Sequence, residues 1–235
     1  NLMVVLAITF ALWIWSVRAR NVTVVDVFWG SGFVIVAWLS ARAAGFSAQS
    51  LLVAGLTTLW GARLSIHLAL RSHGAPEDRR YQKIRVGFGD SFWWKSLFVV
   101  FWFQAILLVI VSLPVQFGMS GNLRWAWGVR GLCIYAVGLF FEVVGDMQLA
   151  DFRRDAANAG RVLDTGLWRH TRHPNYFGDF MVSWGLFVLT RGAAPWWTVV
   201  GPILMSVLLM RVSGAALLES DLKHRKPEYQ DYIRR

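Results

Sequence analysis

Apolar residues occur along this chain in long runs, and not as one stripe on each of several amphipathic helices. A helix needs about 20 consecutive, mainly apolar residues to cross a bilayer. We therefore expect an all-α, polytopic membrane protein with about seven transmembrane helices. The runs place these spans at Leu2–Val17, Thr23–Leu39, Leu51–Leu70, Phe92–Phe117, Trp125–Gly145, Tyr176–Leu189 and Trp196–Leu217.

The segments between the runs give no sign of a second domain. No internal repeat and no linker divides the sequence, so residues 1–235 are expected to form one membrane-embedded domain. Arg18-Ala19-Arg20 follows the first run, where a signal peptide would have a small-residue cleavage site, so that run is expected to remain as a helix. The segments 71–91 and 146–175 are longer than a helix hairpin needs, which is typical of functional loops.

Composition and charge agree with a membrane location. Of the 235 residues, 56% are hydrophobic and 14 are tryptophan, a residue that concentrates at membrane interfaces. The net charge of +10 would suit a nucleic-acid-binding protein, but the basic residues flank the apolar runs and do not cover one face. This placement indicates contact with membrane lipid and argues against a nucleic-acid partner.

Positive charge is unequally divided between the two sets of loops. The loops after the first, third, fifth and seventh spans hold most of the Lys and Arg residues, whereas the opposite loops hold only Arg42, Arg124, Arg130 and Arg191. Because positively charged loops stay in the cytoplasm, we expect the N-terminus outside and the C-terminus in the cytoplasm.

Ionisable groups inside apolar runs are costly, so each is a candidate functional group. Two pairs share a helix face at i, i+4 spacing: Arg63 with His67, and Glu142 with Asp146. Three further polar residues lie singly in the apolar runs or at their ends: Asp26, Gln104 and Asp179. The alternative interpretation is structural, with these groups pairing inside the bundle, for instance Arg63 with Asp26 or Glu142. No metal site is expected, because Cys133 is the only cysteine and the histidines at 170 and 173 have no third ligand nearby.

The densest polar stretch runs from Gly166 to Asp179. Its side chains at 169, 170, 172 and 173 are donors suited to phosphate oxygens. Pro174 suits the first turn of a helix, whose N-terminal dipole would favour an anion there. The plainer interpretation is a positive-inside loop followed by a proline-initiated helix. The nucleotide-binding motifs of soluble folds are missing from the sequence, so a nucleotide would need a pocket formed by membrane helices and inner loops.

Five motifs in this chain resemble the steroid 5-alpha-reductase superfamily, and within it the bacterial DUF1295 branch. They are Val25-Asp-Val-Phe-Trp-Gly30, Trp60-Gly-x-Arg63, Glu77-Asp-x-Arg80-Tyr81, Asp146-x6-Arg153, and Gly166-Leu-Trp-Arg followed by Arg172-His-Pro-Asn-Tyr-Phe-Gly-Asp179. The resemblance covers nearly the whole chain. It implies a seven-helix membrane reductase, with a more variable half at 1–120 and a cofactor-binding half at 121–235, placed in the bacterial inner membrane with its active site facing the cytoplasm.

The resemblance also implies a reaction. Characterised reductases of this superfamily bind NADPH in a cytosol-facing cavity and transfer its hydride to the β-carbon of an enone. We expect NADPH as the cofactor, because several arginines could hold its extra phosphate, and a lipophilic substrate such as a steroid-like enone or an unsaturated lipid. The expected cofactor contacts are Arg63, Asp146, Arg153, Arg169, Arg172, His173, Asn175, Tyr176 and Asp179.

The carbonyl-side residues depart from the family pattern. The steroid enzymes use a Gln-Glu pair on the second span and a Tyr on the third, and the nearest equivalents here are Asp26 and Trp60, which we predict as catalytic residues. Burial is expected to raise the pKa of Asp26 and so allow it to act as an acid. Trp29 and Gln104 are predicted substrate contacts.

Two other functions remain open. Arg172-His-Pro-x-Tyr-x-Gly also resembles the isoprenylcysteine and phospholipid methyltransferases, which bind S-adenosylmethionine and usually add a Glu-rich patch where this chain has Glu219 alone. A non-enzymatic lipid-binding or scaffolding protein is the third possibility. A scaffold should tolerate Asn175→Ala and Asp179→Ala, whereas an enzyme should not.

Overall fold

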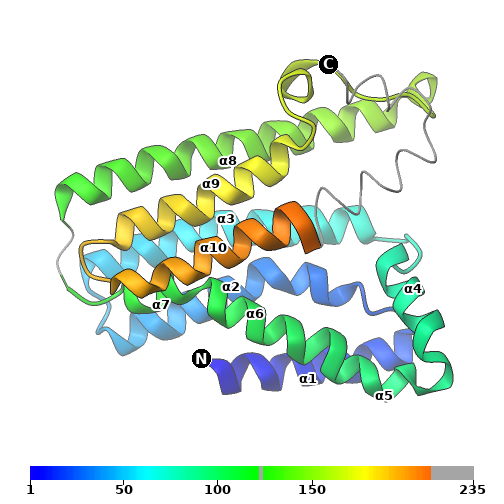
Figure 1. The fold of residues 1–235 in the computed structure, drawn as a ribbon, viewed down its shortest axis with the longest axis horizontal. Helices are drawn as coiled ribbons and strands as arrows, with labels where there is room; N and C mark the ends of the chain where they lie inside the picture. Colours follow the sequence, from blue (N-terminus) through cyan, green and yellow to red (C-terminus); the bar gives the residue numbers. More distant parts are fainter. Residues whose placement is uncertain (122–123, 213–235) are drawn as a thin grey trace. The chain divides into compact units, whose positions relative to one another are not determined.

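The computed structural model describes residues 1–121 and 124–212, and the residues described are helical or irregular, with no strand (Figure 1). The described chain divides into two compact units. The first unit contains residues 1–121 and Ala193–Thr198, and the second contains residues 124–192 and 199–212.

Within the described residues, five helical segments are long and apolar enough to cross a membrane, which confirms a polytopic membrane protein. They are Leu2–Ala19, Val24–Ala43, Ala48–Ser72, Arg79–Val111 and Trp125–Arg154. The sixth and seventh predicted spans coincide with two shorter helical stretches, Pro174–Thr190 and Trp196–Arg211. Residues 213–217 of the seventh prediction lie outside the described residues.

The first unit is built from α1 to α7. Its helices are α1 (Leu2–Ala19), α2 (Val24–Ala43), α3 (Ala48–Ser72), α4 (Arg79–Phe88), α5 (Phe92–Ser96), α6 (Phe103–Val111) and α7 (Leu113–Phe117), with a 3₁₀ turn at Gly89–Ser91 and a π-helical segment at Leu97–Trp102. The predicted loop 71–91 therefore contains a helix. The hydropathy of this segment does not indicate α4, because that helix is rich in Arg and Lys and buries only Tyr81.

α2 and α3 pack together at a pair of glycines (Figure 1). A Cβ atom on Gly30 would collide with the carbonyl oxygen of Gly61, and a Cβ on Gly61 would press on that of Gly30. Beside them, the Ser65 hydroxyl donates to the Val27 carbonyl at 2.7 Å and accepts from the Ser31 N–H at 2.8 Å. This close crossing joins two of the sequence motifs, because Gly30 ends one and Gly61 lies in the next.

The second unit is built on two long neighbouring helices, α8 (Trp125–Arg154) and α9 (Pro174–Thr190), which lie side by side in Figure 1. Glycines at seven-residue spacing line their contact: Gly131, Gly138 and Gly145 on α8, and Gly178 and Gly185 on α9. A Cβ on most of these would meet backbone of the other helix. Small residues let helix backbones approach closely in membranes, so the sequence of the two helices itself sets this contact.

α8 continues nine residues beyond the predicted end of its span at Gly145. At 1.5 Å per residue its 30 residues extend about 45 Å, whereas the hydrocarbon core is about 30 Å thick. The charged turns from Asp146 to Arg154 therefore continue the helix beyond the length that a span needs. The rest of the unit comprises 3₁₀ turns at Ala156–Asn158 and Gly166–Arg169, α10 (Val200–Val207) and a π-helical segment at Leu208–Val212. A further 3₁₀ turn, Trp196–Val199, joins the two units along the chain.

Candidate functional site

A polar cluster in the first unit gathers side chains from α2, α4 and α6, and we call it the Asp26 cluster: Asp26, Trp29, Arg80, Tyr81 and Gln104. The Tyr81 hydroxyl donates to Asp26 Oδ1, and Arg80 Nη2 donates to Asp26 Oδ2 at 2.7 Å. Gln104 Nε2 donates to the Tyr81 oxygen at 2.9 Å, and Trp29 Nε1 donates to Gln104 Oε1. Hydrogen bonds thus run from Trp29 through the amide and the phenol to the carboxylate.

Local structure holds both members of the ion pair between Asp26 and Arg80 in place. Asp26 lies in the first turn of α2, where the helix dipole favours a carboxylate. Asp78 is the N-cap of α4 and accepts from the Arg80 backbone N–H at 2.9 Å and from Arg80 Nε at 3.0 Å. Burial works to raise the pKa of the Asp78 carboxyl, but these hydrogen bonds from Arg80 outweigh it and hold that pKa below its ordinary value of 3.8.

The segment before α4 is fastened to the start of α2 by two further contacts. Glu77 Oε1 accepts from the Val22 N–H at 2.9 Å, and the Asp78 N–H donates to Thr23 Oγ1 at 3.0 Å. Glu77 also pairs with Arg85 on α4, with 2.7 Å between Arg85 Nη2 and Glu77 Oε1. The motif Glu77-Asp-x-Arg80-Tyr81 therefore holds α4 against α2 and delivers two of its side chains to Asp26.

Sequence reasoning missed Arg80 and Tyr81 as partners of Asp26. The motif that contains them was a signal of family resemblance only, and nothing in the local sequence links them to a residue more than 50 positions earlier. Asp26 pairs with Arg80, and not with Arg63 as one structural interpretation expected. Both Asp26 oxygens accept hydrogen bonds in this arrangement, and its role as an acid stays a prediction.

The predicted residues Trp60 and Arg63 lie on α3 of the same unit. Trp60 is buried, and its ring meets that of Phe33 edge to face at a centroid distance of 5.1 Å. Phe33 in turn contacts Trp29, at 6.0 Å between ring centroids. The structure therefore joins Trp29 and Gln104 directly, links them to Asp26 through Tyr81, and connects Trp60 to Trp29 through Phe33. Arg63 is half-buried one turn beyond Trp60.

In the second unit, the predicted cofactor residues gather around the start of α9. Asn175 Nδ2 donates to Asp146 Oδ1 at 3.2 Å, which forms what we call the Asp146–Asn175 pair. Pro174 begins the helix and packs on Gly145 of α8, which explains why the pair can form. Asp179 is buried one turn further along α9.

The loop before α9 is anchored on α8 by two hydrogen bonds. Trp168 Nε1 donates to the Gly145 carbonyl at 3.0 Å, and the Leu167 N–H donates to Gln148 Oε1 at the same distance. Gly166 has a φ of 59°, a left-handed conformation that favours glycine, and Gln148 covers it. The aromatic rings of His173 and Tyr176 stack at 5.3 Å, which fixes the last residue of the loop against α9.

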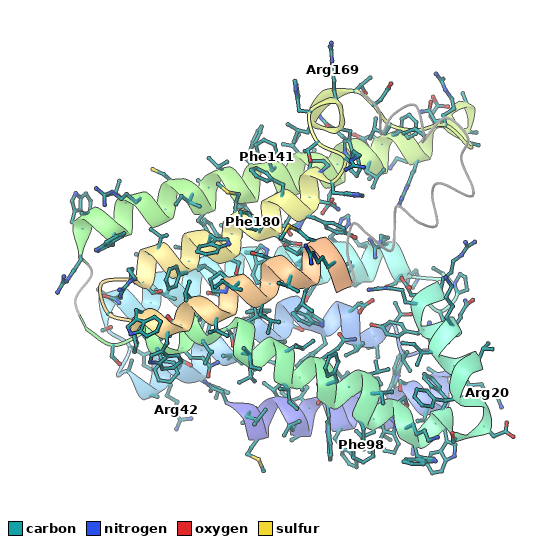
Figure 2. The ribbon with its side chains drawn as sticks, viewed as in Figure 1. Arg20, Arg42, Phe98, Phe141, Arg169 and Phe180 are labelled. Atoms are coloured by element: carbon teal, nitrogen blue, oxygen red, sulfur yellow. The ribbon has the colours of Figure 1, made fainter. Side chains whose placement is uncertain are left out.

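Three predicted phosphate-binding arginines are exposed in this unit: Arg153 on α8, and Arg169 and Arg172 in the loop. Arg153 lies seven residues after Asp146 on a continuous helix, so both share a face of α8. Figure 2 shows Arg169 projecting from the loop away from α8. Eight of the nine predicted cofactor residues therefore belong to the second unit, and Arg63 belongs to the first. Within the described residues, no three His, Cys, Asp or Glu side chains form a group that could hold a metal ion.

Comparison with known proteins places these residues in a family. The family model described as "Protein of unknown function (DUF1295)" matches residues 12–235, a range that contains both clusters. The chain belongs to the DUF1295 family. This DUF1295 protein is also 27% identical over 219 residues to an uncharacterised protein of Schizosaccharomyces pombe, with 76% of the chain and 60% of the yeast protein covered. No solved structure matches the chain significantly.

Proposed function

We propose that this DUF1295 protein is an NADPH-dependent reductase of a carbon–carbon double bond in a membrane-soluble substrate, either a steroid-like enone or an unsaturated lipid. The proposal places it in the bacterial inner membrane with its active site facing the cytoplasm. The resemblance to the steroid 5-alpha-reductase superfamily supports it. The observation that carries it is the Asp146–Asn175 pair, which brings two widely separated motifs together beside a loop rich in arginine.

The residues of the second unit fit the chemistry of NADPH. An amide whose orientation is fixed, as Asp146 fixes that of Asn175, suits the carboxamide of a nicotinamide ring. Exposed arginines such as Arg169 and Arg172 suit phosphate oxygens, which they bind with charge-assisted hydrogen bonds. NADPH would supply the hydride, and these residues would bind and orient it.

The Asp26 cluster supports a second role in the same proposal. Negative charge builds on the substrate carbonyl oxygen as a hydride arrives, and a hydrogen-bond donor must stabilise it. Tyr81 offers a phenol, which is a better proton source than the indole of Trp60. Asp26 and Gln104 orient that phenol, and Arg80 balances the carboxylate. We assign the donor role to Tyr81, whose single hydroxyl proton would turn from Asp26 to the substrate carbonyl oxygen, and a positioning role to Asp26.

Ligand-dependent thermal stability of the detergent-purified protein tests the cofactor. NADPH, NADH and S-adenosylmethionine are added separately to the parent protein and to Asn175→Ala. A ligand at 100 times its dissociation constant adds about 2.7 kcal/mol to the folding free energy, which gives a clear rise in unfolding temperature. We expect NADPH to stabilise the parent and to have no effect on Asn175→Ala.

Asn158→Ala is the matched control, because Asn158 lies in the same unit and its side chain donates to the Phe152 carbonyl at 3.1 Å, away from the Asp146–Asn175 pair in the chain. It should keep the response to NADPH. Stabilisation by S-adenosylmethionine would contradict the reductase and favour a methyltransferase. A folded protein that responds to none of the three ligands would favour a non-enzymatic lipid-binding function.

A further inference from the structure

A second polar site lies in the first unit, apart from the Asp26 cluster. The end of α1 and the turn between α4 and α5 enclose a cleft of about 740 Å³. Its lining includes two arginines and a carboxylate, with serines and a tryptophan between them: Arg20, Arg85, Asp90, Ser16, Ser96 and Trp93. The volume is in the range that small-molecule sites occupy, about 300–1,000 Å³.

The walls of this cleft are held together by hydrogen bonds between α1 and α5. Trp13 Nε1 donates to the Trp93 carbonyl at 2.9 Å and to Ser96 Oγ at 3.2 Å. Arg20 closes α1 in the left-handed region, with a φ of 51°, and its N–H donates to the Ser16 carbonyl. A residue other than glycine seldom adopts this conformation, so the turn of the chain at Arg20 is a defined feature of the cleft.

The two arginines differ in how they are held. Arg85 donates from Nε and Nη2 to the Glu77 carboxylate, and its guanidinium lies 4.4 Å from the centre of the Phe92 ring. Arg85 Nη2 also donates to the Arg20 carbonyl at 3.3 Å. The Nη1 donors of Arg85 make no hydrogen bond within the part of the chain described. The Arg20 side chain is exposed and forms no ion pair with any described residue. The cleft thus offers one cationic donor held by Glu77 and one exposed cationic donor.

The surroundings place this cleft at the level of lipid headgroups. Trp93, which lines the cleft, and its chain neighbour Trp94 are exposed, and Trp residues concentrate where the apolar core of a membrane meets the headgroups. Phe98 projects outward one turn further along the same helical segment, as Figure 2 shows, and would face acyl chains. A ligand of this cleft therefore needs a phosphate for the arginines and an apolar portion for the surface below.

We propose that this cleft binds the phosphoethanolamine headgroup of a membrane phospholipid, with Arg20 and Arg85 at the phosphate and Asp90 at the ammonium group. Asp90 is exposed and forms no ion pair with any described residue. Its negative charge opposes a purely anionic headgroup such as phosphoglycerol. It matches an ammonium group that can donate hydrogen bonds, which the quaternary ammonium of choline cannot do. The proposal is independent of the reductase proposal.

Native mass spectrometry and thermal stability of the purified full-length chain test the proposal. Phosphatidylethanolamine, phosphatidylglycerol and phosphatidylcholine are added at equal concentration, with soluble glycerophosphoethanolamine as a separate sample. We expect phosphatidylethanolamine to bind most tightly and to raise the unfolding temperature. Arg20→Gln should weaken that binding about tenfold, the size of one lost charge-assisted hydrogen bond. Arg20→Lys, which keeps the charge, should retain most of it.

Arg42→Gln is the matched control, since Arg42 is also exposed and lies at the opposite end of α2 from the cleft, as Figure 2 shows. It should bind phosphatidylethanolamine as the parent does. Asp90→Asn should bring phosphatidylglycerol up to the affinity of phosphatidylethanolamine. Equal binding of all three lipids by the parent, or unchanged binding by Arg20→Gln, would overturn the proposal. Equal stabilisation by glycerophosphoethanolamine would also overturn it, because the ligand would then be a water-soluble phosphate ester.

Discussion

The two polar clusters of this protein are positioned by different physical means. The Asp26 cluster takes its residues from three helices, and its members hold one another in place through an ion pair and a series of hydrogen bonds. In the Asp146–Asn175 pair a carboxylate accepts from a neutral amide at 3.2 Å, and the pair forms where glycines bring α8 and α9 close together. Side chains thus organise the first cluster, whereas backbone packing organises the second.

This difference bears on the reaction proposed for them. Asp26 already has a cationic partner at 2.7 Å, so its charge is largely compensated inside the protein. The predicted phosphate-binding arginines of the second unit, Arg153, Arg169 and Arg172, are exposed, and a guanidinium is suited to bidentate contact with phosphate oxygens. The first cluster is therefore suited to orienting one phenol, and the second to binding a phosphorylated cofactor.

The contact of α8 with α9 gives the largest expected effect. Gly138→Ala places a Cβ against the backbone of Val182 and Gly178, at 2.6 Å and 2.8 Å, which neither atom can avoid by a side-chain rotation. The helices must separate, and we expect a cost of about 2–3 kcal/mol in the free energy of unfolding. Equilibrium unfolding in detergent measures it, together with loss of NADPH binding.

Gly55→Ala on α3 is the control for this change, because a Cβ there meets no atom within 4 Å. It should be neutral or slightly stabilising, since alanine has the higher helix propensity. Equal effects of the two substitutions would show that backbone approach does not position the second cluster.

Breaking the ion pair tests the first cluster in the same way. Arg80→Met leaves Asp26 with Tyr81 as its remaining described donor, and we expect a loss of about 2 kcal/mol, less than for a fully buried pair because a third of Arg80 is exposed. Adding Asp26→Asn should recover part of this loss. A double-mutant cycle measures the coupling between the two residues.

The pair of Arg154 with Asp151 on α8 provides the comparison, since its side chains are 80% and 66% exposed. Arg154→Met should change the unfolding free energy by less than about 0.5 kcal/mol. A loss of stability as large as that of Arg80→Met would mean that burial does not strengthen the ion pair between Arg80 and Asp26.

Removing one hydroxyl separates catalysis from cofactor binding. Tyr81→Phe takes the donor from Asp26 and the acceptor from Gln104, at a cost of about 1 kcal/mol in stability. We expect reduction of an enone substrate to fall at least about 100-fold, the usual contribution of a general acid, while NADPH still raises the unfolding temperature. Unchanged turnover would remove Tyr81 from the mechanism and leave the cofactor assignment standing.

The membrane class and most helix positions could be predicted from the sequence, because run length alone identifies a helix that is apolar all round. Three features could not. The charged turns from Asp146 to Arg154 end the hydropathy signal although α8 continues through them, and α4 is too polar to stand out. The link between Asp26 and Tyr81 depends on how the segment 76–80 folds back on α2, and no local pattern reports such a contact.

The smallest expected effect concerns pH and the cap of α4. The pKa of Asp78 is held below its ordinary value of 3.8, so its ionised form stabilises the folded state above that pH. As the pH falls below 3.8, Asp78 takes up a proton in the unfolded chain first, and the contribution decreases. It is lost once the pH is also below the lower pKa of Asp78 in the folded protein. Unfolding curves between pH 3 and 7 should therefore show less acid destabilisation for Asp78→Asn than for the parent. Equal pH dependence of the two proteins would show that the hydrogen bonds from Arg80 do not stabilise the carboxylate, and that α4 is held to α2 mainly through Glu77 and Tyr81.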